Sequence, residues 1–181
     1  MEIEYLHASK YGNGAMVAAA FQKEMATKGA AVDIHHIGEV NPEEVPPADL
    51  YVFSAPGRFG KPIRRMRRFL SRLNLPSGTR YALLTTEAAP KPDKKSARMP
   101  TEEELVKKGQ RVRPIMTGIL QDQGLVKVAE DKIYVIGLKG PLEEEWKEKV
   151  ADFATRIMAT SGSPPGSAGQ STGFNPSTVN P

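Results

Sequence analysis

The sequence contains no cysteine among its 181 residues. That absence excludes a disulfide scaffold, a thiolate zinc site, an iron–sulfur cluster and a cysteine nucleophile. Long apolar runs are also missing, since the longest unbroken one, residues 15–21, is far too short to cross a bilayer. Glu2 and Glu4 stand where a secretory signal would carry Lys or Arg. We therefore expect a cytoplasmic protein with no membrane span.

Acidic residues are absent from one long stretch of the chain, residues 50–86. That stretch carries eight basic residues: Arg58, Lys61, Arg64, Arg65, Arg67, Arg68, Arg72 and Arg80. The formal net charge is +4, so subtracting these eight charges leaves −4 for the rest of the chain. The distribution predicts one strongly basic surface on a mildly acidic protein.

Charged residues are also absent from the C-terminal segment, residues 161–181, which holds five Ser, four Gly and four Pro. Such a composition cannot bury enough apolar surface to offset the entropy lost on ordering. We predict a single domain over residues 1–160, a length that suits one domain, and a disordered tail over residues 161–181.

Strand-like and helix-like segments alternate along the domain. The predicted strands are residues 3–7, 31–36, 50–54, 81–86 and 132–138. The predicted helices are residues 15–28, 62–73, parts of 100–123 and 141–159, the last with Pro141 at its start and Glu143 in its first turn. This alternation predicts an α/β fold with a doubly wound, five-stranded parallel sheet of order 2-1-3-4-5 and helices on both faces. Ligands of such sheets bind beyond the carboxyl ends of the strands, where the strand order reverses.

The loop after the first predicted strand has the residues of an anion site. Its members are Ser9, Lys10, Tyr11, Gly12, Asn13 and Gly14. The glycines allow a tight turn that gathers backbone N–H groups, and the following helix adds the positive end of its dipole. Ser9 and Tyr11 add hydroxyl groups. This combination suits a phosphate monoester, although the same residues could form a plain strand–helix connection.

The loop after the third predicted strand combines glycine, arginine and an aromatic residue. Its members are Pro56, Gly57, Arg58, Phe59 and Gly60. Phe59 could lie against a planar ligand while the glycines expose peptide groups to the ligand's edge. The alternative is a turn whose Phe59 packs into the core.

The two loops together resemble the flavodoxin-like family. The segment from Ser9 to Gly14 resembles its FMN phosphate loop, with Gly14 where threonine is common. The segment from Pro56 to Gly60, with the helix that follows, is similar to the ring-binding loop of flavodoxin-fold NAD(P)H:quinone oxidoreductases and is reminiscent of the flavodoxin-domain protoporphyrinogen dehydrogenases. The resemblance implies bound FMN, with Thr85, Thr86 and Glu87 closing the other side of the flavin ring.

The resemblance implies an oxidoreductase or electron-transfer protein in which the flavin carries the chemistry and no residue is catalytic. The hypothesis we favour is a two-electron reduction of a quinone-like acceptor, with NAD(P)H as a candidate electron donor. Donor and acceptor are small molecules or proteins, and a homo-oligomer is left open. The alternatives are a one-electron shuttle and a flavin-free binding module that docks partners through the basic segment from Arg64 to Arg72.

Other chemistry has weaker signals. The adjacent His35 and His36 would point to opposite faces of a strand, so we predict no metal site. His7 lies near the predicted site and could contact a ligand, but we favour a structural role at the end of its strand. Asp33 follows Gly12 at a distance that suits a ribose hydroxyl, but it lies in the middle of a strand and we expect it to face solvent. The arginines lack interleaved aromatic residues apart from Phe69, which argues against nucleic-acid binding and favours an acidic redox partner.

Overall fold

The computed structural model describes residues 1–137 and 139–161. Five strands form one parallel sheet of order β2-β1-β3-β6-β7. These strands are β1 (Glu2–His7), β2 (Ala31–His36), β3 (Leu50–Ser54), β6 (Arg80–Ala88) and β7 (Val126–Val135). Counted among themselves they have the order 2-1-3-4-5, which confirms the predicted fold class. The order reverses between β1 and β3, so the ligand edge of such a sheet lies beyond the carboxyl ends of these two strands.

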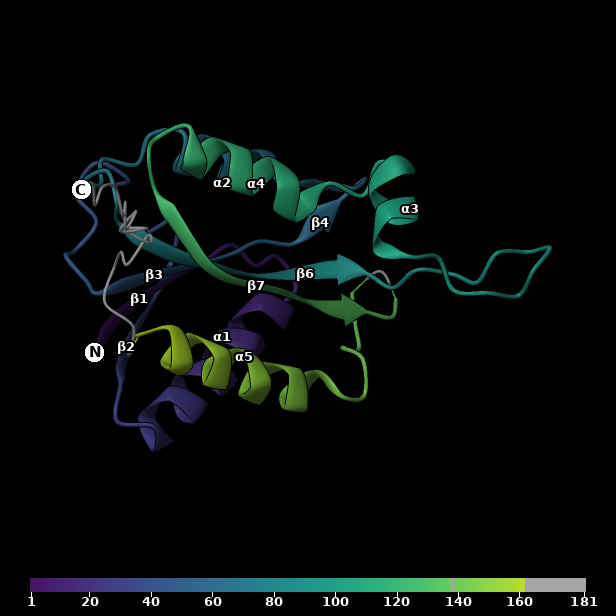
Figure 1. The fold of residues 1–181 in the computed structure, drawn as a ribbon, viewed down its shortest axis with the longest axis horizontal. Coiled ribbons are helices and arrows are strands. Elements are labelled where there is room, and N and C mark those ends of the chain that lie inside the picture. Colours follow the sequence, from purple (N-terminus) through teal and green to yellow (C-terminus); the bar gives the residue numbers. More distant parts are fainter. Residues whose placement is uncertain (138, 162–181) are drawn as a thin grey trace, which may run out of the picture.

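Helices cover both faces of the sheet (Figure 1). One layer holds α1 (Asn13–Thr27) and α5 (Trp146–Ser161), and the other holds α2 (Arg64–Leu70) and α4 (Val112–Gln121). Each layer has its own apolar core: Phe21 and Phe153 meet beneath the sheet at 5.8 Å between ring centroids, and Met66 and Met116 are fully buried above it. The short helix α3 (Glu102–Lys107) lies at the carboxyl edge.

Several predicted boundaries are wrong. The last strand begins at Val126, six residues before the predicted start, and pairs with β6 from Arg80 onward. The last helix begins at Trp146, so Pro141 and Glu143 precede it; the Glu143 carboxylate instead accepts a hydrogen bond from the Tyr134 amide at 2.7 Å. Ser161 closes that helix, and the remainder of the predicted tail, residues 162–181, lies outside the described residues.

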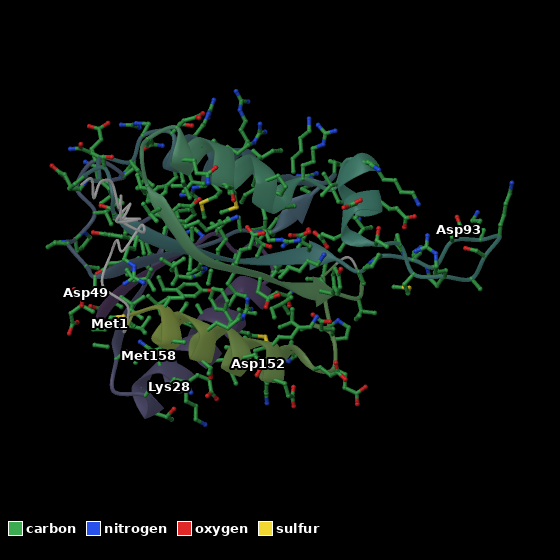
Figure 2. The ribbon with its side chains drawn as sticks, in the orientation of Figure 1. Met1, Lys28, Asp49, Asp93, Asp152 and Met158 are labelled. Atoms are coloured by element: carbon green, nitrogen blue, oxygen red, sulfur yellow. The ribbon has the colours of Figure 1, made fainter. Side chains whose placement is uncertain are left out.

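Two features at the carboxyl edge were not predicted. The loop after β3 forms a small antiparallel hairpin of β4 (Gly57–Arg58) and β5 (Lys61–Pro62). Residues 89–100, here called the arm, extend away from the end of β6 (Figure 1). Asp93, labelled in Figure 2, lies in the outer part of the arm. The Asp93 carboxylate accepts hydrogen bonds from the amides of Lys95 and Ser96, both 3.0 Å, which makes the turn at the arm's end.

Candidate functional site

Three segments that follow neighbouring strands meet at the carboxyl edge of the sheet. The amide of Ala8 donates to the carbonyl of Ser54 at 2.9 Å, which ties the end of β1 to the end of β3. The amide of Thr86 donates to the carbonyl of Ala55 at 3.1 Å, which ties β6 to the loop after β3. The fold therefore brings together the three segments that the sequence analysis selected.

The first segment forms a compact turn around the N-terminus of α1. Gly12 has φ +87°, and its amide donates to the Ser9 hydroxyl at 3.0 Å. The first intrahelical bond runs from the Met16 amide to the Gly12 carbonyl. Within the described residues the backbone amides of Asn13, Gly14 and Ala15 have no assigned acceptor, as expected for a first helical turn. Such a set of convergent donors suits an anion.

Cationic side chains surround this turn. The ammonium groups of Lys10 and Lys139 lie over the ring of Tyr11, at 5.4 and 5.7 Å from its centroid. The Asn13 side-chain amide donates to the Lys139 carbonyl at 3.1 Å, so the segment after β7 is fixed beside the turn. Lys139 was not predicted, because more than a hundred residues separate it from the loop and only the strand order places it there.

Gly14 has a local reason for departing from the threonine of the resembled loop. A Cβ at this buried position would lie 3.3 Å from both the Ala8 carbonyl oxygen and the Ser9 Cβ. By contrast, a Cβ at Gly12 would meet nothing within 4 Å. The space in front of Gly12 is therefore open, whereas the space beside Gly14 is already filled by the loop itself.

The second segment presents an aromatic ring to solvent. Phe59 is 90% exposed, so the alternative in which it packs into the core is wrong. It occupies the tip of the β4–β5 hairpin with φ +51°, followed by Gly60 with φ +72°. Positive φ at both central residues is typical of a tight hairpin turn, but it is unfavourable for a bulky residue such as phenylalanine. Strained residues of this kind are concentrated at functional sites.

Close packing holds the hairpin in place. A Cβ at Gly60 would lie 2.1 Å from the carbonyl oxygen of Gly109, and one at Gly57 would lie 2.7 Å from Cγ2 of Val112. The Arg111 amide donates to the Gly60 carbonyl at 2.6 Å. Both glycines therefore let the hairpin approach the junction of α3 and α4, and the exposed ring projects from a firmly packed base.

The third segment is buried. Thr85, Thr86 and Glu87 are each less than 5% exposed. The Glu87 carboxylate accepts from the Thr85 hydroxyl at 2.8 Å and from Nε of Arg113 at 3.2 Å. Its side chain thus interacts with the protein interior, and the backbone of this segment pairs with β7.

Arg113 is the centre of an ion-pair network behind the site. Its guanidinium contacts the carboxylates of Glu87, Glu102 and Glu130, and Lys132 also contacts Glu102. Burial alone would raise the pKa of Glu102, but Lys132 and Arg113 outweigh it and hold that pKa below its usual value. The network joins α3 and α4 to β6 and β7, which fixes the carboxyl edge. No sequence signal indicated it, because the partners come from four separate segments.

The histidines lie on β1 and β2. His7 is buried beside His36 with 5.4 Å between ring centroids, and Nε2 of His35 lies 3.0 Å from the Glu4 carboxylate. Asp33 is exposed, as expected. Among residues 1–137 and 139–161 there is no group of three or more potential ligands that could hold a metal ion, and no helix is long and apolar enough to cross a membrane.

The strand order, the turn at α1 and the hairpin together define a doubly wound α/β protein with a ligand edge between β1 and β3. No protein-family model matches the sequence. No curated protein matches it either.

Solved structures do resemble this one. Oxidised flavodoxin 2 from Bacillus cereus has a TM-score of 0.65 at 18% identity, covering 88% of this chain and 99% of its own. A flavodoxin from Streptococcus pneumoniae TIGR4 has a TM-score of 0.60 at 19% identity, covering 88% and 99%. Rubredoxin oxygen:oxidoreductase from Desulfovibrio gigas has a TM-score of 0.64 at 10% identity. That match covers 88% of this chain but only 35% of the Desulfovibrio protein. The chain therefore has a flavodoxin-like fold.

Proposed function

We propose that this chain binds FMN at the carboxyl ends of β1, β3 and β6 and transfers electrons between a donor and an acceptor. The observation that carries the proposal is the turn at Gly12, where three backbone amides without assigned acceptors meet an open space at the switch point of the sheet. An exposed aromatic residue projects from the neighbouring loop of the same edge. The solved structures that share the fold include proteins named as flavodoxins.

In this proposal the chain's own groups bind and orient the cofactor. The amides after Gly12, with the hydroxyls of Ser9 and Tyr11, hold the phosphate, and the cationic groups of Lys10 and Lys139 balance its charge. Phe59 and the peptide groups of Pro56 and Gly57 border the ring. Thr85, Thr86 and Glu87 close the opposite side, as the resemblance implies. When bound, FMN supplies a ring that accepts and returns two electrons.

Arg58 adds an electrostatic contribution. Its guanidinium carbon lies 5.5 Å from the centroid of the Phe59 ring, so a positive charge accompanies the ring that we propose borders the flavin. Positive charge stabilises the negative charge that reduction adds, which favours a flavin that is readily reduced. This supports our choice of a quinone-like two-electron acceptor. NAD(P)H as donor stays a prediction from the resemblance.

The test is a titration of the purified protein with FMN, followed by quenching of the flavin fluorescence. We expect saturable quenching for the wild type and none for Gly12→Val, because a branched side chain would enter the open space where the phosphate is proposed to lie. Gly78→Val is the matched control, since Gly78 has φ +86° and open space like Gly12 but precedes β6, at the opposite edge of the sheet.

Both substitutions impose the same backbone strain, so unfolding followed by circular dichroism should show equal losses of stability. Only Gly12→Val should lose FMN binding. Equal FMN binding by the two variants would contradict the proposed phosphate site. No quenching by the wild type at high micromolar concentration would contradict flavin binding altogether and favour a flavin-free module.

A further inference from the structure

One face of α2 consists of arginine side chains. Arg64, Arg67, Arg68 and Ser71 recur at the spacing of one helical face and, with Arg72, line an open groove of ≈ 550 Å³. The opposite face of the helix is buried through Met66, Phe69 and Leu70. Packing therefore fixes the helix so that its guanidinium groups face solvent together.

A second groove continues from the first toward the proposed FMN site. Its volume is ≈ 450 Å³, and Arg64 and Arg67 line both grooves. The remaining lining residues come from the hairpin and its connection to α2: Arg58, Phe59, Lys61, Pro62 and Ile63. The two grooves together lead from the end of α2 to the exposed ring of Phe59. We call this surface, made by Arg58, Lys61, Arg64, Arg67 and Arg68, the basic face.

The cations of the basic face have no internal counter-charge. Within the described residues none of the five takes part in an ion pair, whereas the nearby Arg72 pairs with Glu43 at 2.7 Å and the buried Arg113 contacts three carboxylates. Arg67 lies at the junction of the two grooves, and its Nε is buried without a hydrogen-bond partner in that part of the chain. Arg67 therefore anchors the basic face: its Nε is enclosed by the protein, while its side chain lines both open grooves.

We infer that the basic face binds a carboxylate-rich surface of a partner protein that exchanges electrons with the bound cofactor. The inference rests on the proposed function, because the groove ends at the hairpin that we place beside the flavin. Arginine binds carboxylates through paired hydrogen bonds, and complementary charge brings such partners together rapidly and in a fixed orientation.

The shape of the surface favours a protein over other anions. Small-molecule sites are enclosed and mostly apolar, whereas these grooves are open and lined mainly by cationic side chains. Binding of single-stranded nucleic acid normally requires several aromatic platforms for the bases. Phe59 is exposed on this surface, but Phe69 is 5% exposed and belongs to the core. An acidic protein surface needs only the distributed positive charge that is present.

The experiment measures binding of the full chain to two carboxylate-rich probes. One is a fluorescein-labelled octaglutamate peptide, followed by anisotropy, and the other is an acidic plant-type [2Fe–2S] ferredoxin, followed by calorimetry. We expect Arg64→Glu/Arg68→Glu to weaken binding of both probes at least about tenfold at low salt, and Arg67→Gln to weaken it about threefold. Raising sodium chloride from about 20 to about 200 mM should weaken wild-type binding at least about tenfold.

The matched control is Lys23→Glu/Lys147→Glu, which makes the same change of charge with two exposed residues of α1 and α5 on the other face of the sheet. It should weaken binding much less than Arg64→Glu/Arg68→Glu does, because those charges lie on the opposite side of the sheet from the basic face. An equal loss in both double variants would reduce the effect to net charge and overturn the inference. Tighter binding of a labelled oligothymidylate than of both acidic probes would overturn it in favour of nucleic acid.

The outcome is separable from that of the FMN titration. Both probes are measured with and without FMN, and neither requires turnover. Ferredoxin binding that is lost in the double arginine variant while FMN titration remains normal supports the inference. Normal FMN binding with no affinity for either probe overturns the inference and leaves the proposed function intact. If the protein binds the probes but does not bind FMN, both the proposed function and the role of the basic face in electron transfer are overturned.

Discussion

Arg113 shows how single residues support the edge on which the proposed site lies. Its side chain is 11% exposed and contacts three carboxylates, of which Glu87 is itself 4% exposed. Burial would lower the pKa of Arg113, but the surrounding carboxylates, first Glu87, raise it and keep the guanidinium charged. Glu87 could be chosen from the sequence because it follows a strand. Its partner Arg113 could not be chosen in this way, because the sequence around neither residue indicates the contact between them.

His7 predicts a pH dependence of stability. Burial lowers its pKa from the ordinary 6.5, the neighbouring His36 lowers it further, and Glu39 raises it. The unfolded chain therefore binds a proton more readily than the folded one, and stability falls as pH decreases from about 6.5 toward the lower folded pKa. Between about pH 5.5 and 7.5, we expect the free energy of unfolding measured in urea to rise with pH more in the wild type than in His7→Asn, by at most about 1.4 kcal/mol per pH unit.

The measurement should stop near pH 5, because carboxylates whose pKa is lowered in the fold, among them Glu102, begin to titrate below it. Above about pH 8 the wild type and His7→Asn should show parallel pH dependences, since neutral imidazole no longer changes charge there. Identical slopes in the acidic window would mean that His7 does not contribute.

At the scale of elements, the β4–β5 hairpin is the part of the proposed site that sequence patterns did not show. Its strands are two residues each, too short to produce an alternating pattern. Its glycines did identify a turn. Their second role, contact with the junction of α3 and α4, depends on the helix α4, which begins more than fifty residues later in the chain. The sequence therefore identified this loop as part of a site, but it did not predict the hairpin conformation.

The contact between Gly57 and Val112 predicts an energetic coupling of the hairpin to α4. Gly57→Ala should destabilise the protein by about 1–3 kcal/mol, because the new methyl group would overlap Cγ2 of buried Val112. In a Val112→Ala background, which removes that atom, the same change should cost less than about 0.5 kcal/mol. Urea unfolding of the four proteins gives the coupling energy directly.

Gly118 supplies the control for this cycle. It lies inside α4, and a Cβ there would meet nothing within 4 Å. Gly118→Ala should therefore stabilise the protein by about 0.5–1 kcal/mol in either background. A cost of Gly57→Ala that is unchanged by Val112→Ala would show that the hairpin can shift away from α4 without loss.

At the scale of the whole molecule, the sheet and its strand order followed from the alternation of strands and helices, because few right-handed topologies accommodate it. The ends of elements were less predictable. Half of the residues in the first part of β7 (126–131) are charged, namely Lys127, Glu130 and Asp131, so this part lacks the apolar pattern of a buried strand. The Glu-rich segment before α5 has helical composition, but Glu143 pairs with the Tyr134 amide and keeps the chain extended there.

The arm has a consequence for proteolysis. Residues 91–99 are all exposed, and Lys94, Lys95 and Arg98 lie within them; Lys91 precedes a proline and resists trypsin. The segment 161–181 contains no lysine or arginine, so it offers trypsin no competing site. Brief digestion should therefore cut first between residues 94 and 99, giving two fragments on a denaturing gel. First cuts elsewhere would show that the arm is protected.

The cut chain should nevertheless elute as one particle in gel filtration. The first fragment would contain β1, β2, β3 and β6, and the second β7 and α5, and the pairing from Arg80 with Val126 to Ala88 with Val135 joins them. The core beneath the sheet, where Phe21 of the first fragment meets Phe153 of the second, adds to that association. The covalent link at the arm is therefore dispensable once folding is complete. The two fragments, produced as separate polypeptides, should associate into the same folded structure.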